Sequence, residues 1–138
     1  MTNMRSRSAW LALTAVLAIE LVLGLVLVIT MIPTFPEAGP DQAALMPLWV
    51  SLLISMILAC LWIAVTLVGA MRRQGSWVRG SAVTIHVLMF AAALGVFQGI
   101  LGTPAVGALL LGLAVVGFAS AILIGKPAEA APQISEAG

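Results

Sequence analysis

The chain has 138 residues, of which 62% are hydrophobic and only 8% are charged. Its mean hydropathy is +1.19. A soluble domain of this length needs a largely polar surface around its core, so this composition excludes one. The net charge of +1 says little about partners. The single cysteine, Cys60, excludes both an intrachain disulfide and a metal site built from several thiolates.

Four apolar segments are long enough to cross the hydrocarbon core of a bilayer, which takes about 20 helical residues. They cover residues 9–32, 48–71, 82–101 and 105–124. We therefore predict an all-α integral membrane protein whose four transmembrane helices form an antiparallel bundle. The links between them are short, so no room is left for a soluble domain.

The first segment follows a basic stretch, residues 1–8, and could be confused with a secretory signal peptide. Its apolar part is far longer than the about 7–15 residues of a signal sequence, and no A-x-A cleavage site follows. We expect it to remain as the first membrane helix.

The basic residues fall on one side of this four-helix arrangement. Link 33–47 holds Glu37 and Asp41 but no Lys or Arg, and link 102–104 has no charge. By the positive-inside rule, both termini and link 72–81 are cytoplasmic, and the other two links face outward. We expect a multi-pass protein of the cell membrane with a disordered tail at 125–138. The six basic residues are Arg5, Arg7, Arg72, Arg73, Arg79 and Lys126.

Tryptophans mark the expected membrane interfaces, where amphipathic rings prefer to lie. Trp10 and Trp77 fall near the inner interface and Trp49 near the outer one. Together with Trp77, the basic residues Arg72, Arg73 and Arg79 are expected at the lipid headgroups. Three bases are fewer than a lipid-binding cluster has, so we interpret them as topological charge.

Small residues predict how the last two helices pack, because close approach drives helix association in lipid. At about 100° per residue, one arc of the third helix holds small residues and a possible donor, Gln98. We expect an antiparallel hairpin of the third and fourth helices packed through this arc. Its residues are Ala91, Gly95, Gln98, Gly99 and Gly102, and the fourth helix offers Ala108 and Gly112, and also Gly117, Ala121 and Gly125, at four-residue spacing.

Glu20 is the one charged residue inside the apolar run of the first helix. Counted at about 1.5 Å per residue it lies about 16 Å deep, close to the midplane. We find no cation at that depth and expect Glu20 to be protonated. Its hydrogen bond would then go to a helix carbonyl, a hydroxyl or another chain.

His86 is expected on the side of the third helix away from Gly95, about 9 Å from the inner end. It would face the first or second helix, a partner protein or the headgroups. A haem or metal site is disfavoured because no second ligand lies three or four residues away. We expect no cofactor and no metal.

Four short helices with a membrane glutamate in "LAIEL" resemble the small multidrug resistance transporters. That resemblance implies a proton-coupled exporter that uses Glu20. The chain departs from the family pattern: it has no Tyr to build the site, and the end of the first helix, "VLVITMI", lacks the expected Lys. Its one-sided charge also differs from that of the antiparallel dimers.

The order of "RRQGSWVRGSAVTIHVLMF", a Gly-rich third helix and "GTPAVGALLLGLAVVGFASAIL" is similar to small four-helix membrane proteins of actinobacteria. Some of these accompany the respiratory supercomplex of a cytochrome bc complex and a terminal oxidase. The resemblance implies an accessory or structural subunit that contacts lipid and other integral membrane subunits, and it carries over no catalytic residue.

Motifs of enzymes are missing from the sequence, among them H-E-x-x-H, C-x-x-C, G-x-S-x-G and a Walker-type loop. The basic residues beside the membrane lack a stacking platform for nucleic acid. We expect a non-catalytic subunit of a larger membrane complex, which the resemblance to the actinobacterial proteins implies to be respiratory, with no small-molecule substrate and no nucleic-acid partner. The exporter is the alternative.

Overall fold

Four α-helices and one short 3₁₀ helix make up the described part of the structure, a computed structural model that describes residues 2–73, 75–99 and 103–124. In chain order they are α1 (Thr2–Met31), the short 3₁₀ helix η1 (Ile32–Thr34), α2 (Gln42–Met71), α3 (Gly75–Phe97) and α4 (Pro104–Ile124). Each of the four α-helices is long and apolar enough to span a membrane. The chain is therefore a multi-pass membrane protein with an all-α fold, as the composition predicts.

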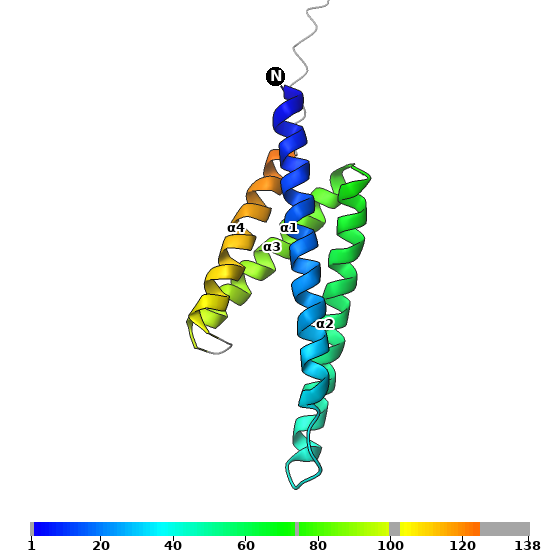
Figure 1. Cartoon of the computed structure of the whole chain (residues 1–138), viewed down its shortest axis with the longest axis vertical. Coiled ribbons are helices and arrows are strands. Elements are labelled where there is room, and N and C mark those ends of the chain that lie inside the picture. The colour runs from blue at the N-terminus through cyan, green and yellow to red at the C-terminus, as the bar shows by residue number, and fades with distance from the viewer. Residues whose placement is uncertain (1, 74, 100–102, 125–138) are drawn as a thin grey trace, which may run out of the picture.

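The helices form two antiparallel hairpins, α1–α2 and α3–α4 (Figure 1). α1 packs between α2 and α4, whereas α3 packs mainly on α4. We call the end where α1 begins and α2 turns into α3 the basic end, because Arg7, Arg72, Arg73 and Arg79 lie there. Away from the basic end the two hairpins diverge, and α3 runs obliquely across the bundle (Figure 1).

The hydrophobic core lies in the half of the bundle nearest the basic end. It brings together small and branched side chains from all four helices: Leu13, Leu17, Ala70, Val78, Ala82, Ile85 and Ala121. Residues seven apart share one helix face, so one face of α1 shows where this core stops. Leu13 is 0% exposed, Glu20 is 3% exposed and Leu27 is 56% exposed. Burial on this face therefore ends at Glu20.

The link between α2 and α3 is shorter than predicted. α3 begins at Gly75 rather than at residue 82, which reduces link 72–81 to a tight turn and places Trp77 and Arg79 on the helix. Arg73 and Gly75 adopt left-handed backbone conformations, with φ of 52° and 65°. Two such residues reverse the chain within very few positions. Composition suggested a longer link because its polar residues resemble a loop, whereas those after residue 74 lie on α3.

The other helix ends differ from prediction as well. α2 begins at Gln42 rather than 48 and contains Pro47 inside the helix, where proline has no N–H to donate to the carbonyl of Ala43. α3 ends at Phe97 rather than 101. Gly99 follows in a left-handed conformation with φ of 78°, the geometry that stops a helix. The predicted start of link 102–104 and the tail 125–138 lie outside the described residues.

Aromatic packing holds the α1–α2 link at the end opposite the basic end. The rings of Phe35 and Trp49 meet edge to face, with centroids 5.1 Å apart. The indole of Trp49 also donates a hydrogen bond to Thr34 Oγ1 at 3.3 Å. Trp49 thus lies at the end of the helical bundle where an interfacial ring was expected.

Candidate functional site: a buried glutamate–histidine pair

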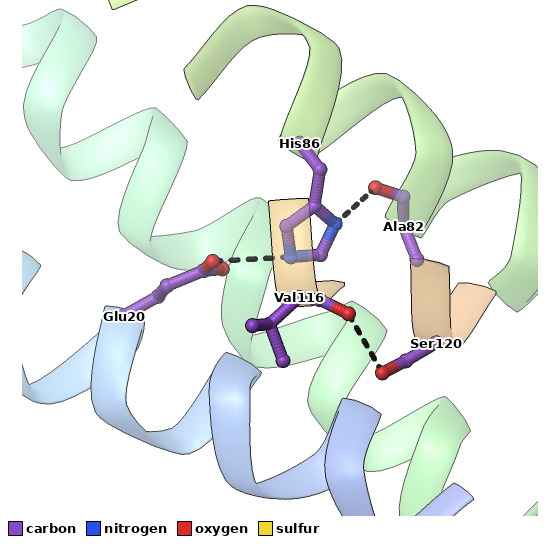
Figure 2. A network of polar contacts seen from close by, with 5 residues as sticks. All are labelled: Glu20, Ala82, His86, Val116 and Ser120. Atoms are coloured by element: carbon purple, nitrogen blue, oxygen red, sulfur yellow. Dashed lines mark hydrogen bonds and ion pairs between the residues drawn. The ribbon is translucent and has the colours of Figure 1, made fainter. Parts of the chain in front are cut away.

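Glu20 of α1 and His86 of α3 meet inside the bundle. Oε1 of Glu20 lies 3.1 Å from Nε2 of His86, and Figure 2 shows the two side chains pointing toward each other from opposite helices. They lie where the buried face of α1 ends, so this contact joins the two hairpins next to the point from which they diverge.

Both side chains are withdrawn from the surface. Their side-chain exposures are only 1% for Glu20 and 0% for His86. Among the described residues, neither carboxyl oxygen of Glu20 has a hydrogen-bond partner of ordinary geometry, and neither has Nε2 of His86. The 3.1 Å contact is thus short but poorly aligned, and these polar atoms have only each other.

A backbone carbonyl fixes the orientation of the His86 ring. Nδ1 lies 2.6 Å from the carbonyl oxygen of Ala82, one turn earlier on α3 (Figure 2). A carbonyl oxygen can only accept a hydrogen bond, so Nδ1 carries a hydrogen and donates. In the neutral ring Nε2 is then an acceptor that faces Glu20.

Gly117 of α4 makes room for the ring. A Cβ atom built on Gly117 would overlap Nε2, Cδ2 and Cε1 of His86. The imidazole therefore lies directly against the α4 backbone and crosses over it toward α1. Ser120, one turn further along α4, does not bond to Glu20 because its hydroxyl donates to the carbonyl of Val116 at 2.7 Å.

The expectation that Glu20 lacks a partner within the chain is wrong. It depended on the assumed start of the third helix, which placed His86 too close to the inner surface. Counted from Gly75, the first residue of α3, His86 lies about 16 Å along its helix at about 1.5 Å per residue. That matches the depth of Glu20 counted from residue 9. The expectation that His86 faces the first or second helix is confirmed by its contact with α1.

The predicted α3–α4 hairpin is present. Its predicted packing face is wrong for α3 and for Ala108 and Gly112 of α4, whereas Gly117 and Ala121 of α4 are buried. On α3 and just after it, Ala91, Gln98 and Gly99 are exposed, and on α4 so are Ala108 and Gly112. A Cβ atom built on Gly95, Gly99 or Gly112 would meet nothing within 4 Å. Gly102 lies outside the described residues, as does Gly125.

α3 and α4 pack through a partly different set of small and branched residues. Ala93 and Val96 of α3 are buried, and so are Gly107, Ala114, Gly117 and Ala121 of α4. Gly107, Ala114 and Ala121 follow one another at seven-residue spacing. Two arcs of small residues compete on α4. The seven-residue spacing of these small residues was the signal that could have identified the face of α4 that packs on α3.

The aromatic and basic residues predicted at the interface gather near the basic end. Trp10 is partly buried against the core. Trp77 is 46% exposed, and its ring covers Gly69, where an added Cβ would lie 2.6 Å from the indole. Arg72 and Arg73 are exposed, and Arg79 is partly buried.

A second polar contact joins α2 to α3 and was not predicted. The indole of Trp62 donates to Ser81 Oγ at 2.7 Å. The hydroxyls of Ser81 and Thr66 lie 2.6 Å apart. Trp62 is too deep for an interfacial tryptophan, and that unusual depth was the signal that its N–H needs a partner within the protein.

Two apolar cavities open near the pair, and neither is lined by Glu20. One, of about 360 Å³, lies between α3 and α4 and includes His86, Phe90 and Phe118. The other, of about 290 Å³, lies between α1 and α2 and includes Leu25 and Cys60. In the described part of the chain, no three His, Cys, Asp or Glu side chains are grouped so that they could hold a metal ion.

No known protein family, curated protein or solved structure gives a significant match to this chain. The resemblances to small multidrug transporters and to actinobacterial supercomplex subunits therefore stay predictions. What the site can do follows from its own chemistry: a carboxyl and an imidazole, placed together out of water, can hold a proton between them.

Proposed function

We propose that this protein is a non-catalytic accessory subunit of a larger membrane assembly, with a respiratory oxidase complex as the expected partner. The observation that carries the proposal is the early end of the shared core. Leu13 and Glu20 lie on one face of α1. Seven residues further along the same face, Leu27 is 56% exposed. Beyond Glu20 this face presents an exposed apolar side chain at Leu27, which suits contact with a transmembrane segment of another subunit.

The polar groups of the spans support a structural rather than a transport role. Glu20 is engaged with His86, and the hydroxyls of Thr66 and Ser81 are engaged with each other. An exporter needs a cavity in which polar and aromatic groups receive a substrate. The two cavities described above are apolar and do not include Glu20.

The alternative is a proton-coupled exporter that uses Glu20. One observation favours it, because a buried carboxyl beside an imidazole is a plausible proton site. That chemistry serves a structural link equally well, so the alternative is distinguished by its transport activity and not by the pair itself.

Site-specific photocrosslinking in native membranes tests the accessory role. A photoreactive residue at Leu27 lies on the face that continues the core, and one at Ile29 lies on the opposite face at nearly the same depth; Ile29 is 64% exposed. We expect Leu27 to crosslink to one defined membrane subunit that co-purifies in stoichiometric amount, and Ile29 to crosslink mainly to lipid.

Recovery of oxidase subunits with the Leu27 variant would identify the partner complex. Crosslinking of both positions to lipid only, together with proton-driven efflux that is lost in Glu20→Gln, would reject the accessory role in favour of the exporter.

A further inference from the structure

The arrangement around His86 determines how many protons the buried pair holds. Nδ1 donates to the carbonyl of Ala82, so the neutral ring presents a bare Nε2 to Glu20. A carboxylate and a bare ring nitrogen are both acceptors, and at 3.1 Å they would repel without a hydrogen between them. The contact therefore requires one proton on the line between Oε1 and Nε2.

We propose that Glu20 and His86 form a proton-binding site that holds a single shared proton inside the membrane and thereby links the two hairpins. The proton lies either on the carboxyl, which then donates to Nε2, or on the ring, which then donates to the carboxylate. In both forms the pair as a whole carries no net charge.

Near the pair, the four described helices offer no other charged side chain to balance a second proton or the loss of the first. α2 and α4 contain no Asp, Glu, His, Lys or Arg, and α1 and α3 add only arginines near the basic end. The one further titratable group that α2 contributes is the thiol of Cys60, which lies against Gly24. A net charge at the site is strongly disfavoured in surroundings of such low polarity.

One consequence follows from this balance. Losing the proton leaves two acceptors face to face, which separates Glu20 from His86. Gaining a second proton gives the pair a net positive charge, which is strongly disfavoured in these surroundings. The site is a proton-dependent contact between α1 and α3. This inference rests on the contact itself and not on the proposed accessory role.

Nitrogen NMR of the ring tests the proposal directly, because His86 is the only histidine of the chain. Protein labelled with ¹⁵N-histidine is placed in lipid bilayers and measured from about pH 5 to about pH 8, where ordinary histidines titrate. We expect Nδ1 to carry a hydrogen and Nε2 to show a hydrogen-bonded signal.

Two variants separate a shared proton from mere packing. Glu20→Gln replaces the carboxyl by an amide that can still donate to Nε2 but cannot exchange a proton. We expect it to keep the Nδ1–H tautomer. Glu20→Met removes the donor, and we expect the hydrogen-bonded Nε2 signal to be lost.

The unmodified protein is sufficient to overturn the proposal, even if a variant does not fold. A ring whose Nε2 shows no hydrogen-bonded signal would show that the pair does not share a proton. A ring with its hydrogen on Nε2 and a bare Nδ1 would do the same.

Discussion

The missing side chain of Gly117 is what allows the His86 ring to reach α1. A methyl group at this position would overlap the imidazole, so the ring or the helix would have to move. We expect Gly117→Ala to lower the free energy of unfolding by about 1–3 kcal/mol, the usual cost of overfilling a packed site. Unfolding in mixed micelles, with increasing amounts of denaturing detergent, measures this change.

Gly112 provides the matched control on the same helix, because an added Cβ there meets nothing within 4 Å. Gly112→Ala should change the free energy of unfolding by no more than about 0.5 kcal/mol. Equal effects of the two substitutions would mean that the His86 ring does not lie against Gly117.

The interaction between Glu20 and His86 can be measured by a double-mutant cycle. Glu20→Met and His86→Phe keep the approximate size and shape of the side chains. Each single substitution leaves one buried polar group unpaired, at a cost of about 1–3 kcal/mol, whereas the double substitution removes both. We therefore expect the double variant to be more stable than the sum predicts by about 0.5–3 kcal/mol.

A cycle between Glu20→Met and Ser55→Ala serves as the comparison. Ser55 is exposed on α2, and its hydroxyl donates to the carbonyl of Ser51 within the same helix. Its effect should add to that of Glu20→Met. If the cycle of Glu20 and His86 were also additive, the two side chains would not interact in the folded protein.

At the level of helices, one serine, Ser81, takes part in two side-chain hydrogen bonds between α2 and α3. Ser81 accepts from Trp62 and bonds to Thr66. We expect Ser81→Ala to lower the free energy of unfolding by about 1 kcal/mol, since hydrogen bonds between membrane helices contribute modestly. Thermal unfolding in detergent, followed by circular dichroism, measures the loss.

Ser55→Ala again supplies the control, because its bond stays within one helix and the helices keep their contacts without it. Its expected change is below about 0.5 kcal/mol. A loss of the same size in both variants would show that the hydroxyl of Ser81 does not join α2 to α3.

Helix number and class were predictable from the sequence because both depend on long apolar runs, and four such runs occur. Helix ends were not, because they depend on backbone conformation at Arg73, Gly75 and Gly99, where φ is positive. The short α2–α3 turn moved the start of α3 by seven residues relative to the predicted 82. That single shift is why His86 was assigned the wrong depth and the partner of Glu20 was missed.

Helix packing was predictable only as far as the pairing of neighbours in the chain. α3 and α4 were expected to pack because few residues separate them. The choice of face could not be made, because α4 carries small residues on more than one side: Gly112 is open, whereas Gly107 and Gly117 are in contact with α3. Composition alone does not distinguish them, since the decision depends on the shape of the partner side chains Val96, Phe97 and His86.

For the whole molecule, the arginines at one end of the bundle predict its orientation in the membrane. Arg7, Arg72 and Arg73 are exposed at the basic end, and the positive-inside rule assigns that end to the cytoplasm. In a Cys60→Ala background, one cysteine is introduced at Ser76 and, in a separate variant, at Gly39. Both positions are exposed, at opposite ends of the bundle.

An impermeant maleimide added to intact cells should label the Gly39→Cys variant at once and the Ser76→Cys variant only after permeabilisation. Labelling of both variants in detergent controls for reactivity. Labelling of Ser76→Cys alone in intact cells would invert the orientation, and labelling of both would indicate a mixture of orientations, as expected of an antiparallel dimer. Either result would move the Leu27 face to the other leaflet in some or all molecules, and the accessory partner would then have to be sought there.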